Sequence, residues 1–318
     1  MRYGISPRKK SVRTAKHFAW RFLFRRRHDG LHCRVSFATR LVLRQRLPSL
    51  SISETRARMN TPQRIVCLSA EAADWFQRIG AWGRVVGVTA FFLPPPATQP
   101  KPRVSGFSSA NLERIEKLNP DLIVTFSDVQ AKFAAELMQR GFLVLATNQR
   151  TLAETEATLT LLARIVDCER AGGKLLAEFR ERLAPAKKHF PRPRIYFEEW
   201  NEPLVSGICW VSELIERAGG EDIFSEFKSK RAASERVISP EQILHANPEI
   251  IFASWCGKPV QISEFAARSG WNRLSAVRKN RIYEIPGEDI LQPGFRLIHG
   301  YEQIKSHLQT ISCAALSH

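Results

Sequence analysis

The chain has 318 residues and a formal net charge of +17, a value that first suggests a nucleic-acid-binding protein. The charge is uneven, because residues 1–58 hold 16 Lys and Arg against two acids, whereas residues 59–318 carry a net charge of only +3. The globular part is thus nearly balanced, and the length predicts about two domains of roughly 100–200 residues each. No run approaches the roughly 18 apolar residues of a membrane span, and the six cysteines form no C-x-x-C pair, which argues against a disulfide framework and a zinc site.

Residues 1–60 are predicted to be a disordered basic leader, because arginine clusters such as Arg25–Arg27 interrupt scattered apolar residues without any period. Three interpretations stay open: a stretch translated from a start codon assigned too early, with Met59 as the true start, an Arg-rich targeting peptide, or an arm for nucleic acid or anionic membrane. The arginines leave no apolar run long enough for a secretory signal. The compartment stays open, and the cytoplasm is one alternative.

From Arg64 onward, short β-branched runs alternate with helical stretches, as is typical of parallel βαβ units. The pattern predicts an α/β fold with a first lobe over residues 61–150 and a second lobe over residues 192–312. The expected strands are Arg64–Ser69, Arg84–Thr89, Asp121–Phe126 and Leu143–Thr147 in the first lobe, and Arg194–Trp200, Glu249–Trp255 and Arg281–Ile285 in the second.

Residues 151–191 contain no strand pattern and are predicted to form a long helical bridge between the lobes. Apolar residues recur there at helical spacing, and the stretch Glu169–Lys188 spans about 30 Å if it is one helix with a rise of 1.5 Å per residue. Pro185 lies inside this stretch and is a candidate for an early helix end.

An internal repeat relates the two lobes. The segment from Asn111 reads NLERIEKLNPDLIV and the segment from Ser239 reads SPEQILHANPEIIF, with a constant offset of 128 residues. Each copy predicts a short helix ended by Asn-Pro and followed by a buried strand. Two such lobes place the carboxyl ends of both sheets around one crevice, where open α/β sheets bind ligands.

With these segments in view, the chain resembles the cobalamin and ferric-chelate family of ABC-transporter substrate-binding proteins over about residues 63–312. The motifs that carry the resemblance are RIVCLS at Arg64, GVTAFFLPP at Gly87, NLERIEKLNPDLIV at Asn111, PLVSG at Pro203 and PEQILHANPEII at Pro240. The resemblance implies two Rossmann-like lobes joined by a long helix, the class III periplasmic-binding-protein fold. It also implies a monomer that binds cobalamin, or another corrinoid, for ABC-type uptake, without catalysis, a cofactor of its own or a nucleic-acid partner.

The resemblance also points to site residues. Family members of the cobalamin-binding branch line the cleft with aromatic side chains at strand ends, and dock to arginines of the permease through one Glu on each lobe. The corresponding docking residues here are Glu113 and Glu241, for which the plain alternative is an acid at a helix N-terminus. The expected ligand-binding residues are Phe91, Phe107, Phe126, Glu198, Trp200, Trp255 and Arg296. For the tryptophans ordinary packing, and for Arg296 a solvated helix position, are the alternatives.

Other ligands and an enzymatic role remain as alternatives. A ferric-siderophore receptor needs cationic groups, for which Arg103, Arg150, Arg236 and Arg296 are the candidates. A haem receptor needs an axial ligand, for which the candidates are His245, His299 and Tyr283. A metal-ion site is disfavoured because residues 59–150 contain no histidine. For an enzyme, only Glu198 with Glu199 as acid and base, or Cys67 as a nucleophile, present themselves.

Overall fold

The computed structural model describes residues 61–186 and 191–316, with side chains up to residue 311. These residues belong to one unit, residues 57–318, and the predicted leader of residues 1–60 lies outside the described part. Among the helices that the structure describes, none combines the length and apolarity that a membrane span requires.

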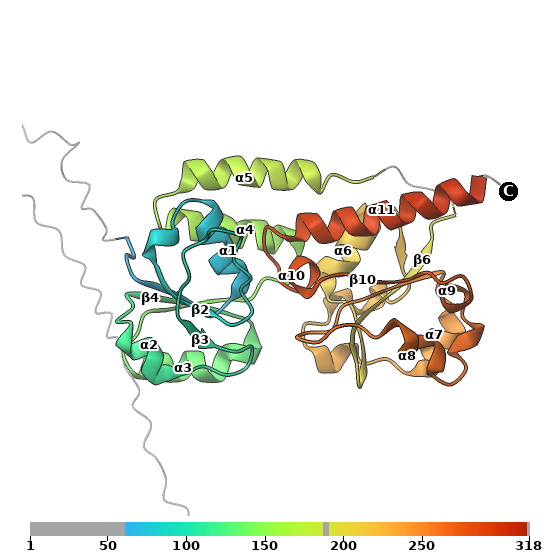
Figure 1. The fold of residues 1–318 in the computed structure, drawn as a ribbon, viewed down its shortest axis with the longest axis horizontal. Coiled ribbons are helices and arrows are strands. Elements are labelled where there is room, and N and C mark those ends of the chain that lie inside the picture. The colour runs from blue at the N-terminus through green and yellow to red at the C-terminus, as the bar shows by residue number, and fades with distance from the viewer. Residues whose placement is uncertain (1–60, 187–190, 317–318) are drawn as a thin grey trace, which may run out of the picture. The chain divides into compact units, whose positions relative to one another are not determined.

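The first lobe is built on a parallel sheet with the strand order β3-β2-β1-β4-β5 (Figure 1). Its strands are β1 (Ile65–Cys67), β2 (Val85–Thr89), β3 (Arg103–Ser105), β4 (Leu122–Phe126) and β5 (Val144–Thr147), and its helices are α1 (Ala70–Arg78), α2 (Leu112–Lys117) and α3 (Ala131–Gln139). Four of these strands agree with the sequence pattern. The edge strand β3 was not predicted, because three residues after a proline-rich segment are too few to show alternation.

The second lobe is built on a sheet with the order β10-β9-β6-β7, in which β8 also pairs with β6. Its strands are β6 (Arg194–Asn201), β7 (Leu204–Ser206), β8 (Glu221–Asp222), β9 (Ile250–Ala253) and β10 (Ile282–Glu284). Its helices are α6 (Cys209–Arg217), α7 (Pro240–Ala246), α8 (Ile262–Ala267), α9 (Ser275–Arg278), α10 (Gly287–Ile290) and α11 (Leu297–Leu316). All pairings are parallel except the β6–β7 hairpin, whose short second strand the sequence pattern did not reveal. Single 3₁₀ turns lie at Trp82–Arg84, Asp128–Gln130, Ser225–Ser229, Ala233–Arg236 and Trp271–Arg273.

The structure confirms the repeat in detail. Asn111 and Ser239, which are 128 residues apart, are the N-caps of α2 and α7, and each side chain accepts a hydrogen bond from a backbone N–H of the first turn. At the other end, Asn119 and Asn247 both have a positive φ, of 44° and 43°, a conformation that asparagine tolerates better than most residues. The same local chemistry therefore starts and ends both helices, and each helix is followed by a buried strand.

The repeat also fixes each strand against its neighbour. The Asp121 carboxylate accepts from the backbone N–H of Arg64, just before β1, and the Glu249 carboxylate accepts from that of Arg194, at the start of β6. The strand that follows then pairs in the same way, with Ile65 opposite Leu122 and Ile195 opposite Ile250. Both sheets thus have equivalent central strand pairs, β1 with β4 and β6 with β9. These pairs set the direction in which the carboxyl ends of the strands point.

The connection between the lobes is a helical hairpin, and not one long helix. α4 (Leu152–Arg164) begins at a capping box formed by Thr151 and Glu154, and α5 (Glu169–Arg182) packs back along it (Figure 1). The early helix end considered at Pro185 is confirmed, because α5 stops at Arg182, and the stretch Glu169–Lys188 is not one helix. Its 14 residues span only about 21 Å.

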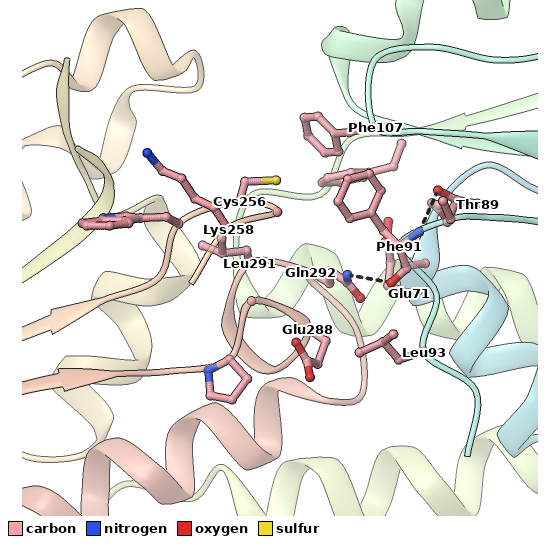
Figure 2. A pocket seen from close by; sticks show the side chains of 18 of the residues that line it. Glu71, Thr89, Phe91, Leu93, Phe107, Cys256, Lys258, Glu288, Leu291 and Gln292 are labelled. Atoms are coloured by element: carbon pink, nitrogen blue, oxygen red, sulfur yellow. Dashed lines mark hydrogen bonds between the residues drawn. The ribbon is translucent and has the colours of Figure 1, made fainter. Parts of the chain in front are cut away.

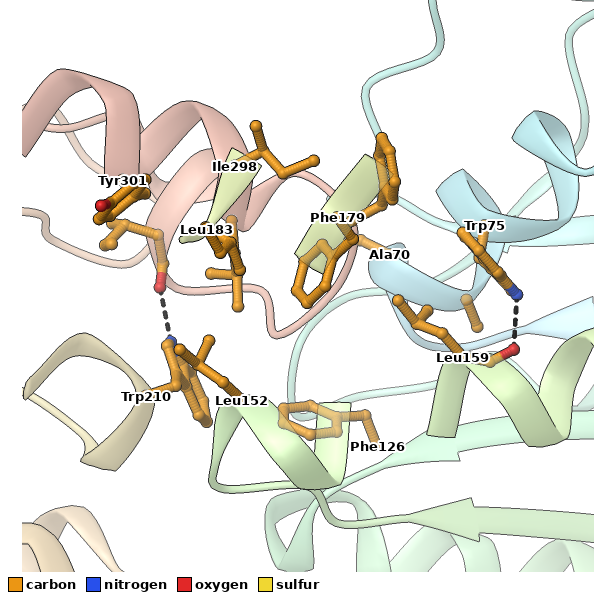
Figure 3. Close-up of a cluster of buried hydrophobic side chains, with 14 of the residues drawn as sticks. Ala70, Trp75, Phe126, Leu152, Leu159, Phe179, Leu183, Trp210, Ile298 and Tyr301 are labelled. Atoms are coloured by element: carbon orange, nitrogen blue, oxygen red, sulfur yellow. Dashed lines mark hydrogen bonds between the residues drawn. The ribbon is translucent and has the colours of Figure 1, made fainter. Parts of the chain in front are cut away.

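An aromatic contact joins the lobes beside this hairpin. Phe295, between α10 and α11 of the second lobe, is buried with its ring 5.9 Å from Trp75 of α1 and 6.0 Å from Phe179 of α5. Arg78 lies over the same ring at 4.9 Å. Figure 3 shows Trp75 and Phe179 in a cluster that continues to Trp210 and Tyr301, so one hydrophobic core extends through both lobes.

Gly294 allows this contact. A Cβ atom at Gly294 would lie 2.6 Å from the Cβ of Glu71, so only glycine lets the chain pass this close to the first turn of α1. Next to it, the Gln149 amide donates a hydrogen bond to the Pro293 carbonyl at 3.1 Å. Residues 293–295 therefore hold the second lobe against the first.

We expect the Phe295→Ala substitution to lower the free energy of unfolding by about 3–5 kcal/mol, because it leaves a cavity between Trp75 and Phe179. Urea denaturation followed by circular dichroism measures the change. The matched control is Leu143→Ala, since the Leu143 side chain is 65% exposed and its truncation should change stability by no more than about 0.5 kcal/mol. Equal effects of the two substitutions would contradict the assignment of Phe295 as the contact that joins the lobes.

Candidate functional site

A cavity of about 570 Å³ lies where the carboxyl ends of both sheets meet (Figure 2). The segments after β1, β2, β3 and β4 line it from the first lobe, and the segments after β9 and β10 line it from the second. The lining residues are Leu68, Ser69, Ala70, Glu71, Thr89, Ala90, Phe91, Leu93, Phe107, Phe126, Gln130, Trp255, Cys256, Gly257, Lys258, Pro259, Glu284, Pro286, Gly287, Glu288, Leu291 and Gln292. The crevice expected from the topology is therefore present.

Three phenylalanines form the aromatic part of the first-lobe wall. Phe91 follows β2, Phe107 follows β3, and Phe126 is the last residue of β4. The rings of Phe91 and Phe107 are 6.1 Å apart and nearly perpendicular, an edge-to-face arrangement. Phe107 remains 43% exposed, so a ligand can cover much of its ring. The structure thus brings the three predicted phenylalanines together.

A buried glutamine, Gln130, holds this wall in place. Its Oε1 accepts from the backbone N–H of Phe126 at 3.0 Å, and its Nε2 donates to the carbonyl oxygens of Leu68 and Phe107 at 3.0 and 3.1 Å. One side chain thereby connects the chain after three strands, and it satisfies backbone groups that would otherwise be buried without partners. The sequence pattern did not reveal Gln130, because its role depends on contacts over up to 62 residues.

The second-lobe wall touches the first across the cavity. Gly257, which follows β9, has a φ of +76° and lies against Phe91, so that an added Cβ would be 3.5 Å from the Phe91 ring. Gln292 reaches the Phe91 carbonyl oxygen from the other side, with a long hydrogen bond of 3.5 Å (Figure 2). Phe91 is therefore the point at which both lobes meet inside the site.

Glu198, expected to bind the ligand, does not line the cavity. It is fully buried and accepts hydrogen bonds from Arg268, from the Trp255 indole N–H and from the Tyr196 hydroxyl. Charge-assisted bonds of this kind compensate its burial. No residue of β6 lines the cavity, and the sequence did not show that the Glu198 carboxylate would pair with Arg268, 70 residues away.

The tryptophans are also arranged differently from the expectation. Trp255 lines the cavity, but it is only 4% exposed and stacks on Phe265 at 6.1 Å. Trp200 lies outside the lining, and the Lys258 ammonium occupies its ring face at 4.4 Å. Trp255 therefore has no open face for a flat macrocycle, and ordinary packing is its better description. Trp200 does not reach the cavity.

Arg296 is not part of the cavity either. Its guanidinium pairs with Asp289 at 2.6 Å. Arg296 follows Phe295 in the sequence, directly before α11, and is not among the lining residues. Gln292, four residues earlier, is the residue of this segment that reaches the site. The sequence identified the right segment, but it did not determine which of its residues faces the ligand.

Glu71 is, like Gln130, a lining residue that sequence reasoning missed. It lies in the first turn of α1, is only 5% exposed, and its Oε1 has no hydrogen-bond partner among the described residues. Burial raises the pKa of Glu71 to about 7, although hydrogen bonding of the carboxyl group to the Glu71 backbone N–H and the Ser69 hydroxyl opposes this rise, and the nearby Asp74 carboxylate adds to it. A Glu within the otherwise small and apolar run that starts α1 was the available signal.

The charged groups of the cavity are mostly acidic. Glu71, Glu284 and Glu288 line it together with one cation, Lys258. Lys258 donates to Asn201 at 2.7 Å, and Glu284 accepts from the Val260 N–H at 3.0 Å. Among the described residues, no arginine, histidine or tyrosine lines the cavity, so the site favours neutral or cationic ligands over anionic ones.

The groups considered for catalysis are inert or paired. Cys67 is fully buried, and burial raises the pKa of its thiol. Glu199 is paired with Arg236 by two hydrogen bonds, as Glu198 is with Arg268. Within the described residues, no group of three His, Cys, Asp or Glu side chains is placed to hold a metal ion.

Comparison with known proteins identifies the family to which the chain belongs. The chain matches the family described as periplasmic binding protein over residues 65–288. It belongs to the periplasmic binding protein family. The role that goes with this family is the binding of a substrate.

Relatives and solved structures agree with the family. A "Vitamin B12-binding protein" of Vibrio parahaemolyticus is 26% identical over 273 residues, which cover 83% of this chain and 96% of the relative. The crystal structure of the periplasmic vitamin B12 binding protein BtuF of Vibrio cholerae has a TM-score of 0.61 and 24% identity, covering 79% of this chain and 98% of that one. The periplasmic heme-binding protein RhuT from Roseiflexus has a TM-score of 0.67 and 19% identity, covering 77% and 97%. The two structural comparisons show the class III fold.

Glu113 and Glu241 take equivalent places in this periplasmic-binding-protein fold. Both are exposed in the first turn of their helices, α2 and α7, and these helices lie on the same side of the two sheets (Figure 1). A hydrogen bond from the Ser239 hydroxyl lowers the pKa of Glu241, which keeps it ionised. The repeat therefore presents one carboxylate from each lobe.

The Glu71→Gln substitution should stabilise the protein at alkaline pH and not at acidic pH. Between the ordinary pKa of 4.5 and about 7, the folded protein keeps a proton that the unfolded chain releases, so wild-type stability falls as pH rises through this window. Glutamine does not titrate, and its advantage should grow by up to about 3 kcal/mol between pH 4.5 and pH 8. Urea denaturation at both pH values measures it, and a difference that is the same at both would contradict the assignment.

Proposed function

We propose that the protein binds a corrinoid of the cobalamin type in the cavity between its lobes for ABC-type uptake and releases it unchanged. The observation that carries the proposal is the character of the cavity: an apolar, phenylalanine-lined crevice at the carboxyl ends of two sheets, with a few polar groups. Its volume of about 570 Å³ lies within the roughly 300–1,000 Å³ of ligand sites. The exposed rims of Phe107 and Leu93 leave one edge open for the part of a large ligand that projects out.

The runner-up, a ferric siderophore, is less well supported because the candidate arginines are engaged elsewhere. Arg103 donates to the carbonyl oxygens of residues 89, 90 and 92, and Arg150 pairs with Asp128. Arg236 pairs with Glu199, and Arg296 with Asp289. An anionic chelate would therefore meet a cavity whose charged groups are mostly carboxylates.

Haem is disfavoured on the same kind of evidence. His245 lies on α7, His299 lies on α11 near Glu302, and Tyr283 stacks on His307 with ring centroids 3.8 Å apart. None of the three lines the cavity, so a haem iron placed there would lack the axial ligand expected from the chain. The similarity to a haem-binding protein, at 19% identity, extends to the fold alone.

Isothermal titration of the purified chain with cyanocobalamin, cobinamide and ferrichrome tests the function. We expect heat with both corrinoids and none with ferrichrome, and the Phe107→Ala variant should bind about tenfold more weakly, a loss of about 1.4 kcal/mol. Leu161→Ala is the matched control, because Leu161 is similarly exposed, at 44%, on α4. If neither corrinoid produces heat, the function is refuted.

We further propose that Glu113 and Glu241 dock to arginines of a membrane permease. The support is their symmetric place in the repeat, their exposure and the position of α2 and α7 on one side of the unit, away from α5 (Figure 1). Rim charges of this kind act on encounter and orientation.

Charge reversal at both positions, Glu113→Lys with Glu241→Lys, should weaken binding to a vitamin B12 ABC transporter in nanodiscs by at least tenfold and leave cyanocobalamin affinity within twofold. Surface plasmon resonance measures the first quantity and calorimetry the second. The control is Glu181→Lys, an exposed position on α5. If the double variant and Glu181→Lys weaken binding to the transporter to the same extent, the docking role of Glu113 and Glu241 is wrong.

A further inference from the structure

The cavity is lined by a buried carboxyl group, that of Glu71, of which one oxygen has no hydrogen-bond partner among the described residues. Only 5% of the Glu71 surface is exposed, and the oxygen concerned is Oε1. The fully buried Glu198 provides the contrast, since it has donors from Arg268, Trp255 and Tyr196. Both carboxyls are buried to a similar degree, but only the one outside the cavity is saturated.

Within the part of the chain that the structure describes, no cationic side chain pairs with Glu71. Its neighbour Asp74 on α1 is paired with Arg78 at 2.7 Å, and Lys258, the cavity's cation, donates to Asn201. Gly294 packs directly on the Glu71 backbone and closes this side of the residue without contributing a side chain. A buried acceptor without a partner destabilises a fold, so a residue of this kind in a ligand cavity indicates that the ligand completes it.

The other polar groups of the cavity differ in how far they are engaged. Gln130 uses its oxygen and its nitrogen on three backbone groups, and the exposed Glu284 accepts from Val260. Among the residues described, the buried Ser69 hydroxyl has no partner other than the Glu71 carboxyl. Glu71 is thus the deeply buried lining carboxyl with a free acceptor, next to walls that are otherwise largely apolar. This combination suits a ligand with an apolar body and an N–H donor at one end.

We propose that Glu71 is a specificity-determining residue of the cavity, whose Oε1 accepts a hydrogen bond from an amide or a cationic N–H group of the bound molecule. The inference rests on the proposed function in its corrinoid form, because the amide side chains of a corrinoid supply such donors. It also defines what the site rejects: a ligand that places a carboxylate or phosphate opposite Glu71 would meet repulsion in a poorly solvated position.

Two probes and three variants test this role. Cyanocobalamin carries the amide donors, and benzamidine, compared with benzoate, offers an aromatic cation against an aromatic anion. The variants are Glu71→Leu, which keeps the approximate size and removes the acceptor, Glu71→Asp, which keeps the carboxyl group but withdraws it by one methylene, and Asp74→Asn. Asp74 is the matched control, because it is equally buried on the same helix and does not line the cavity. Thermal melts establish that each variant is folded.

We expect Glu71→Leu to weaken cyanocobalamin binding by tenfold or more, Glu71→Asp to weaken it less, and Asp74→Asn to remain within twofold of the wild type. If cyanocobalamin binds wild type and Glu71→Leu equally well, the role of Glu71 is refuted and the corrinoid function stands. If cyanocobalamin does not bind, but benzamidine binds the wild type in ligand-observed NMR and is lost in Glu71→Leu, the function is refuted and the role of Glu71 stands. Binding of neither probe refutes both.

Discussion

The packing of Phe295 between Trp75 and Phe179 is the contact on which the site depends. It brings the end of the second lobe against α1 of the first lobe and α5 of the connecting hairpin. The contact is possible only because Gly294 lets the chain approach the first turn of α1. The same turn holds Glu71, so the contact that joins the lobes also closes one side of the cavity. With one hydrophobic core extending through both lobes, the crevice is largely formed before a ligand arrives.

In and around the cavity, hydrogen-bond satisfaction separates the residues that support the structure from those that still have an unused hydrogen-bonding group. Gln130 and Glu198 are both buried and both saturated, the first by backbone groups after three strands and the second by three side chains. Their work is to hold the walls in place. Glu71 is buried without such compensation, and the aromatic surface of Phe107 is left open. The residues that indicate the ligand are therefore those with an unused acceptor or an uncovered aromatic ring, and not the most polar residues of the cavity.

The sequence predicted the repeat, the central strands and the three phenylalanines because each depends on local chemistry. A cap residue, an Asn-Pro helix end and a buried apolar run act over a few residues, and a side chain directly after a parallel strand has little choice but to face the crevice. Glu198, Trp200 and Arg296 were misplaced because their neighbours Arg268, Lys258 and Asp289 come from other segments. Short elements such as β3 and β7 carried too little periodicity to be seen.

The sequence by itself therefore determined the α/β class, the duplicated lobe and the edge of each sheet at which ligand would bind, since periodicity and capping are encoded within about ten residues. Only the tertiary structure decided which charged groups are neutralised and which remain free. That choice depends on pairs 37–70 residues apart, such as Glu199 with Arg236 and Glu198 with Arg268. It also decided that a short hairpin and one phenylalanine, and not a single long helix, hold the two lobes together, because helix length was limited by Pro185 and the remaining span had to be bridged by packing.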